Sequence, residues 1–337
     1  MPTTRRPRVC VLAPTPLLTV TLESGPDEDS PELHVHPGGQ GLWVARMAEA
    51  LGAEVVVCGP VGGETGTVLA HLAEQEGLRF RRVGYAGGNG AYLHDRREGE
   101  RAEVATVRPA RLDRHELDDL YTTVLVEALD SDVCVITGAD PAELLPPPFV
   151  GRLVGDLRAA GVTTVADLSG EAAQEAARAG VDVLKMAHDE LVDAGLADDD
   201  SVAALRTGAR RLLRLEPGLP EGHGDAHPDD EAEAEAESAG RVGAVLVSRA
   251  AEPALLVTPA GVSELVAPSV TTVDHRGAGD SMTAGTAVGV GRGLELTEAA
   301  RLGAAAGALN VTRHGLGTGH QDQIERFADQ VEVREVG

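Results

Sequence analysis

Positive charge is scarce in this sequence of 337 residues, which has 29 Lys and Arg against 54 Asp and Glu and a formal net charge of −25. So acidic a chain argues against nucleic acid or an anionic membrane surface as its main partner. Long apolar runs are also missing, since none approaches the ~18 residues that a membrane span needs. The apolar run at residues 9–13 is too short for the core of a signal peptide.

Cysteine is equally rare, and the three cysteines lack the spacing of a metal site. Cys10, Cys58 and Cys134 each stand in an apolar, strand-like run. This placement predicts buried free thiols and a reducing, cytoplasmic location. The sequence also lacks a Ser/His/Asp elbow, a Cys–His nucleophile signature and zinc-ligand spacing.

What the sequence does have is a 42% apolar content, enough for the core of one large domain over residues 1–337. Strand-like and helix-like patterns alternate along most of it, which is typical of an α/β fold with a mostly parallel sheet. The predicted strands of this alternation are 9–13, 54–58, 132–137, 162–166, 181–184, 242–247, 254–257 and 261–265. The predicted helices are 38–51, 64–75, 113–129, 149–160, 170–179, 188–194, 202–215, 278–291 and 296–312.

Two regions depart from the alternation. Residues 18–22, 33–36, 78–83, 91–94 and 102–107 read as short strands without helices between them, which predicts a small β-sheet appendage drawn from about 16–36 and 78–107. Residues 216–240 hold three prolines and a run of acids alternating with alanine. This composition predicts an acidic, flexible insertion rather than a domain. A cation-binding segment is the less favoured alternative, because its carboxylates lack the turn glycines of Ca²⁺ loops.

The most informative stretch is Gly277-Ala278-Gly279-Asp280, followed by a small-residue helix pattern. Unpaired amides and the positive end of the dipole make a helix start attractive to phosphate. A carboxylate placed there suggests a general base beside a transferred phosphoryl group. A glycine turn in which Asp280 caps the helix is the simpler alternative, and this segment alone leaves both open.

A family resemblance favours the catalytic alternative. The segment from Asp274 to Asp280 resembles the C-terminal signature of the ribokinase-like, or phosphofructokinase-B, carbohydrate kinases. The cluster Gly38-Gly39-Gln40-Gly41 resembles their N-terminal signature, and residues 16–23 are similar to the start of the 1-phosphofructokinase and tagatose-6-phosphate kinase branch. The resemblance implies a three-layer α/β/α fold, with the small sheet as a lid over the sugar and a possible homodimer through that lid.

The resemblance also implies an ATP- and Mg²⁺-dependent transfer of a phosphoryl group to a hydroxyl of a sugar or sugar phosphate. Asp280 is then the catalytic base, and the amides of Gly277, Ala278 and Gly279 form the anion hole. Glu190 organises Mg²⁺ through water. The implied acceptor-binding residues are Gly38, Gly39, Gln40, Trp43 and Thr19, and the implied nucleotide-binding residues are Ser248, His275, Arg276 and Gly315.

Several positions differ from the pattern of that family. Gln40, Trp43 and Thr19 replace its usual lysine, asparagine and aspartate on the acceptor side. Ala187 replaces the asparagine of an Asn-x-x-Glu motif that ends at Glu190. Ala250 and Pro253 stand where glycines are usual. These departures keep two alternatives open: a nucleoside kinase in which Trp43 stacks on the base, and a catalytically impaired, ligand-binding relative.

In the resembled phosphohexose kinases, cationic side chains bind the phosphate that the acceptor already carries. This sequence lacks a cation at the corresponding positions. Residue 40 is not a lysine, and residues 87–92 of the lid contain no cation. Arg96, Arg97 and Arg101 lie nearby but toward a turn, where exposure to solvent is expected. Because an unpaired dianion is costly to bury, the sequence predicts weaker binding of phosphorylated hexoses than the resemblance suggests.

Overall fold

The computed structural model describes residues 5–25, 30–99, 101–215, 242–313 and 317–336. Within them, ten strands form one sheet. The seven from β11 to β5 are parallel to one another, and β12, β13 and β14 continue the sheet through antiparallel pairs. In spatial order they are β14 (Glu332–Glu335), β13 (Val262–Val266), β12 (Glu252–Val257), β11 (Ala244–Arg249), β10 (Val183–Ala187), β9 (Thr163–Asp167), β8 (Val133–Thr137), β1 (Arg8–Leu12), β4 (Glu54–Val61) and β5 (Arg79–Gly84).

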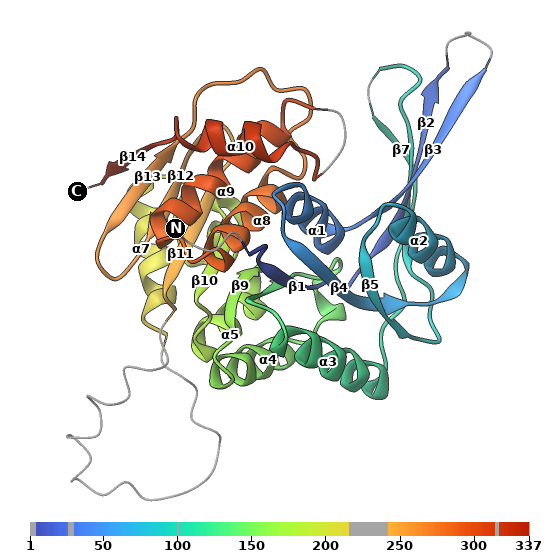
Figure 1. Cartoon of the computed structure of the whole chain (residues 1–337), viewed down its shortest axis with the longest axis horizontal. Helices are drawn as coiled ribbons and strands as arrows, with labels where there is room; N and C mark the ends of the chain where they lie inside the picture. Colours follow the sequence, from blue (N-terminus) through green and yellow to red (C-terminus); the bar gives the residue numbers. More distant parts are fainter. Residues whose placement is uncertain (1–4, 26–29, 100, 216–241, 314–316, 337) are drawn as a thin grey trace, which may run out of the picture.

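Helices cover both faces of this sheet (Figure 1). Each face has its own apolar core. One face carries α1 (Gln40–Ala50), α2 (Gly63–Gln75), α8 (Ala278–Gly291), α9 (Leu296–Asn310) and α10 (Gln321–Ala328). The other carries α3 (Arg114–Leu129), α4 (Pro147–Ala159), α5 (Gly170–Ala179), α6 (His188–Asp193) and α7 (Val202–Leu213). The predicted three-layer α/β fold is therefore confirmed.

Local sequence explains several element boundaries. Asp113 forms a capping box with Glu116 at the start of α3. The hydroxyl of Ser201 accepts a hydrogen bond from the amide of Ala204 and caps the start of α7. Gly285 of α8 meets Gly303 of α9 so closely that a Cβ at Gly285 would lie 2.8 Å from the Gly303 Cα. The small residues of these two helices thus let their backbones pack against each other over the sheet.

A second sheet of four strands projects from the body of the protein (Figure 1). Its order is β3 (Pro31–Gly38), β2 (Leu17–Ser24), β6 (Gly90–Asp95) and β7 (Ala102–Val107). We call these four strands the small sheet. The predicted appendage is present, but one of its five predicted strands belongs elsewhere.

Residues 78–83 were expected in the small sheet, and this prediction is wrong. The corresponding strand, β5, pairs in parallel with β4 at the edge of the large sheet, through the α2 crossover. Phe80 and Val83 are buried against the apolar cores of the large sheet, which explains why β5 joins that sheet. The strand predicted at residues 54–58 is longer than expected, since β4 continues to Val61.

Three further features bear on the predictions. The helix α10 and the strand β14 were not predicted. The expected insertion at 216–240 lies outside the described residues. Among the helices that the structure describes, none combines the length and apolar character that crossing a bilayer requires.

Candidate active site

The site lies at the carboxyl edge of the parallel strands, where the strand order reverses. The chain leaves β1 toward β4 on one side and returns to β8 on the other. Such a reversal opens a crevice between the loops that follow the strands. A cavity of about 190 Å³ lies there, and Thr15 and Leu17 after β1 and Gly138 after β8 line it.

Asp280 stands in the first turn of α8, beside this crevice. Gly277 precedes the helix with a φ of 70°, a left-handed conformation that glycine adopts without strain. The following amides at the helix start have no partner within the helix. The predicted helix 278–291 is thus confirmed, and it presents the amides of Ala278 and Gly279 together with the positive end of its dipole.

Four ionisable side chains converge at this point: Asp280, Lys185, Asp167 and Glu190. Lys185 of β10 donates to Asp167 of β9 over 3.0 Å, and both side chains are buried. Thr283 of α8 donates its hydroxyl to the same carboxylate over 2.7 Å. Glu190 of α6 belongs to the same group electrostatically, since it contributes to the pKa of both Lys185 and Asp280.

These neighbours give Asp280 an unusual pKa. Burial raises it most, Asp167 and Glu190 raise it further, and Lys185 and a hydrogen bond from Gln40 lower it, with a result of about 7. Burial also raises the pKa of Glu190. Burial opposes the charge of Lys185, but the three carboxylates outweigh it and raise its pKa. Asp280 is therefore a carboxylate that can both take up and release a proton near neutral pH.

Gln40 connects the two glycine-rich signatures. Its side-chain oxygen accepts the amide of Gly138 over 3.0 Å. This contact fixes the orientation of the side-chain amide, so its NH₂ group donates to Asp280. Gly39, next to it, has a φ of 101°, and a Cβ there would lie 2.8 Å from the Thr15 carbonyl oxygen.

The other predicted acceptor residues are divided between two cavities. Gly39, Gln40 and Trp43 line the small cavity, together with Tyr92 of β6 and Glu190. Thr19, by contrast, lines a second and larger cavity that also contains Trp43 and Tyr92. Gly38 is buried, and a Cβ there would lie 2.7 Å from the Thr19 hydroxyl oxygen, so packing accounts for this glycine.

On the predicted nucleotide side, Ser248 is half-buried near the end of β11 and His275 is exposed. Ala250 follows with a φ of 50°, the left-handed conformation for which the resembled pattern uses glycine. Ala250 therefore holds a conformation that glycine adopts without strain. Gly315 lies outside the described residues.

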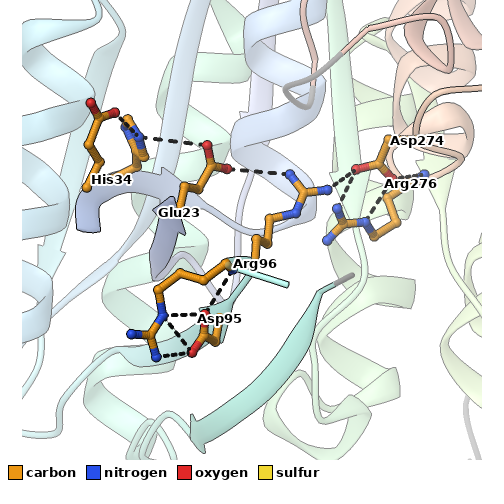
Figure 2. Close-up of polar contacts among 8 residues, drawn as sticks. Glu23, His34, Asp95, Arg96, Asp274 and Arg276 are labelled. Carbon is orange, nitrogen blue, oxygen red and sulfur yellow. Dashed lines mark hydrogen bonds and ion pairs between the residues drawn. The ribbon is translucent and has the colours of Figure 1, made fainter. Parts of the chain in front are cut away.

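Arg276 points toward the small sheet. Its guanidinium is held by the carboxylate of Asp274, and Arg96 of the small sheet approaches the same carboxylate at 3.7 Å (Figure 2). Arg96 also lies 3.7 Å from Glu23 of β2. Figure 2 shows this chain of charges running from the small sheet to the loop before α8. The predicted contact between Arg276 and the nucleotide stays a prediction.

Sequence reasoning missed Lys185 and Tyr92. Lysine in the otherwise apolar strand VLKMA is a signal that could have been used, since a buried ammonium requires a carboxylate partner. Tyr92 donates its hydroxyl to Asp140 over 2.7 Å, which ties the small sheet to the loop after β8. Nothing in the local sequence pattern indicates that contact.

The fold and this arrangement of carboxylates at an open helix start define a phosphotransferase of small molecules. The sequence model of the "pfkB family carbohydrate kinase" matches residues 18–323. The chain therefore belongs to the pfkB family of carbohydrate kinases, and it is a transferase that phosphorylates a sugar hydroxyl.

Three individual proteins illustrate the relationship. The ATP-dependent 6-phosphofructokinase isozyme 2 of Mycobacterium tuberculosis is 27% identical over 98% of this chain and 92% of its own. The 1-phosphofructokinase of Bacillus subtilis is 26% identical over 88% of each. A crystal structure of a mutant phosphofructokinase-2 from Escherichia coli superimposes with a TM-score of 0.77 at 22% identity, over 96% of this chain and 99% of that one.

Proposed function

We propose that the protein transfers the γ-phosphoryl group of ATP to a hydroxyl of a sugar or sugar phosphate, with Asp280 as general base. The observation that carries this assignment is the position of Asp280 at the start of α8, with a pKa of about 7 and a hydrogen bond from Gln40 at the small cavity. A base with a pKa near the working pH combines the deprotonated state with enough basicity to accept a proton.

The neighbouring groups have distinct roles in this proposal. The acceptor hydroxyl enters the small cavity and gives its proton to the Asp280 carboxylate as the phosphoryl group moves. The amides of Gly277, Ala278 and Gly279 stabilise the negative charge on the transferred group. Lys185 holds Asp167 and limits the repulsion that the other carboxylates exert on Asp280.

The cluster also fits a magnesium ion bound in the way that kinases use. Asp167, Glu190 and Asp280 together carry three negative charges when ionised, against one positive charge on Lys185. No group of three or more side chains within the described ranges forms a ready protein cage for a metal. Mg²⁺ commonly binds through phosphates, water and only one or two carboxylates. Glu190, held by the Ala187 amide over 2.6 Å, is suited to orient its water.

When bound, Mg²⁺ neutralises charge on the phosphates. For the nucleotide we retain Ser248, His275, Arg276 and Gly315 as proposed contacts. The three cysteines are free and buried, in keeping with a reducing compartment, and a cytoplasmic location remains part of the proposal.

Replacement of Asp280 tests the proposal directly. We expect Asp280→Asn to lower turnover about 10²–10⁴-fold while ATP binding stays within a few-fold of wild type. Release of ADP with a panel of hexoses, hexose phosphates and nucleosides measures turnover, and calorimetric titration measures ATP binding. Asp322→Asn on α10 is a matched control, because this residue is exposed and lines neither cavity. Turnover of Asp280→Asn within a few-fold of wild type would contradict the assignment of the base.

A nucleoside acceptor is the second candidate, because Trp43 is half-buried and lines both cavities. An indole in that place can stack on a base. The same acceptor panel separates the two candidates: turnover of nucleosides in preference to hexoses and hexose phosphates selects the nucleoside kinase. An absence of ADP release with every acceptor, despite ATP binding, selects the ligand-binding relative.

We further propose that two copies associate through the small sheet. All six residues of β7 are exposed, and Val104 and Val107 each expose 54% of their surface. Leu33 on β3 exposes 60%. Apolar side chains on a projecting sheet favour a self-complementary contact with a second copy. Size-exclusion chromatography with light scattering measures the molar mass of the protein. The double variant Val104→Glu, Val107→Glu should be a monomer where the wild type is a dimer. A wild-type monomer at micromolar concentration would refute this association.

A further inference from the structure

Two guanidinium groups share the carboxylate of Asp274 in the loop before α8 (Figure 2). Arg276 of the same loop donates to it from its backbone amide over 3.1 Å and from its Nε atom over 2.9 Å. Arg96 follows β6 of the small sheet and approaches the same carboxylate at 3.7 Å. One carboxylate therefore joins the small sheet to the turn that opens α8.

Other contacts also anchor the loop before α8 to the body of the protein. The amides of Val273 and Asp274 donate to the carbonyl of Val311 over 2.7 and 3.1 Å. Asn310, at the end of α9, donates its side-chain amide to the carbonyl of Arg276 over 2.7 Å. Because these contacts do not involve the small sheet, loss of the arginine that follows β6 should leave the turn before α8 in place and remove its link to that sheet.

Arg96 lies between two carboxylates. Glu23 of β2 and Asp274 are each 3.7 Å from its guanidinium. The side chain of Glu23 is 42% exposed and that of Asp274 only 9%, so water screens the pair with Glu23 more. The pair with Asp274 is therefore the stronger of the two, and Glu23 competes with it. Arg96 was expected to be exposed at a turn, yet it is half-buried between these partners.

These charges lie in the wall of the larger cavity, which has a volume of about 1740 Å³. Glu23 and Arg96 line it from the small sheet, and Asp274 lines it from the loop before α8. Tyr92 lines both this cavity and the small one, whose volume of about 190 Å³ corresponds to roughly six water molecules. An acceptor whose reacting hydroxyl enters the small cavity therefore extends its remaining atoms between the small sheet and the loop before α8.

We propose that Arg96 is a positioning residue for the phosphoryl transfer: its ion pair with Asp274 holds the small sheet against the loop before α8, and the acceptor is enclosed between them. This inference deepens the proposed function and rests on it for the place of the acceptor. Arg96 acts through Asp274 and not on the reacting atoms. Glu23 opposes it by drawing the guanidinium back toward the small sheet.

The kinetic test separates the KM of the acceptor from kcat, with the acceptor of the panel above that gives the fastest release of ADP. Arg96→Met keeps a long apolar side chain and removes the charge, so it should raise the KM of the acceptor about 3- to 10-fold. Because the turn before α8 keeps its other anchors, kcat and the KM of ATP should stay within about twofold. Arg96→Lys keeps the charge and should restore most of the loss. Glu23→Gln removes the competing carboxylate and should lower the KM of the acceptor.

Hydrogen exchange followed by mass spectrometry tests the same link without depending on turnover. Arg96→Met should speed exchange in peptides of β6 and β7, because the small sheet loses a contact with the body of the protein. Peptides of β1, in the middle of the large sheet, should exchange as in the wild type. In an Asp274→Asn background, Arg96→Met should add no further change to exchange or to the KM of the acceptor, since its partner is already neutral.

Arg97→Met is the matched control, because Arg97 is exposed, pairs with Asp95 of its own strand and does not line the cavity. It should change neither exchange nor the KM of the acceptor. An unchanged KM in Arg96→Met would overturn the inference, as would equal effects of Arg96→Met and Arg97→Met or a full effect in the Asp274→Asn background. Wild-type turnover in Asp280→Asn refutes the base and leaves the readouts of Arg96 standing, whereas loss of turnover there with an unchanged KM in Arg96→Met keeps the base and refutes the positioning role.

Discussion

Gln40→Met tests how the first glycine-rich signature acts on the second. Methionine has nearly the same length and shape as glutamine, but it can neither donate to Asp280 nor accept the Gly138 amide. The change therefore removes a hydrogen bond that stabilises the charged form of Asp280. We expect the pKa of Asp280 to rise above its present value of about 7.

The size of the effect follows from the strength of that hydrogen bond. A hydrogen bond to a charged group contributes about 1.5–3 kcal/mol, and one pKa unit corresponds to about 1.4 kcal/mol. The pKa should accordingly rise by about one to two units. At pH 7 the wild type has about half of Asp280 in the carboxylate form, and a rise of one unit leaves about a tenth.

The sign of the pH dependence follows from the role of the group. A general base works when deprotonated, so kcat/KM increases as the pH rises through the pKa of Asp280. ADP release measured from pH 5.5 to 9.5 should give an acid limb with a midpoint near 7 for the wild type. The midpoint should move upward in Gln40→Met to about 8–9, so that about half or more of the activity is recovered at pH 9.

Gln40→Lys is the matched variant of opposite sign, because a cation at residue 40 should lower the pKa of Asp280 and move the midpoint toward acid. A uniform loss of kcat/KM at every pH, with the midpoint fixed in both variants, would refute the reasoning. Such a result would mean that residue 40 positions the acceptor and does not tune the base.

Two predictions concern stability. Ala250→Gly should raise the free energy of unfolding by about 0.5–1 kcal/mol in urea titrations. The φ of 50° at Ala250 costs an L-residue about 1–2 kcal/mol, and the greater loss of chain entropy by glycine offsets part of that gain. A lower urea midpoint for Ala250→Gly would show that the methyl group of Ala250 makes stabilising contacts. Lys185→Met should destabilise the protein by about 3–5 kcal/mol at pH 8, since it leaves Asp167 buried without its cation. That loss should shrink toward pH 5.5, where Asp280, whose pKa is raised to about 7, takes up a proton. A loss below about 1 kcal/mol at pH 8 would contradict the structural role of Lys185.

The segments that the sequence predicted well are those whose conformation depends on nearby residues. The helices 278–291 and 296–312 were predicted from the apolar and small residues over a few positions, and α8 and α9 confirm them. The resemblance of the two glycine-rich signatures then indicated the family. Burial of the three cysteines likewise followed from the apolar runs around them.

Tertiary structure alone decided which sheet each strand joins and which charges meet. β5 is as short as the strands of the small sheet and was expected among them, but the α2 crossover brings it beside β4. Lys185 and Asp167 are 18 residues apart, and they meet because β9 and β10 are neighbours in parallel. Arg101 was expected to be exposed at a turn, yet it is half-buried and lines a cavity with Tyr92 and His94 of β6, the strand with which β7 pairs. A sequence pattern reports the environment of a residue along its own element, whereas pairing between distant elements fixes which side chains meet at the site.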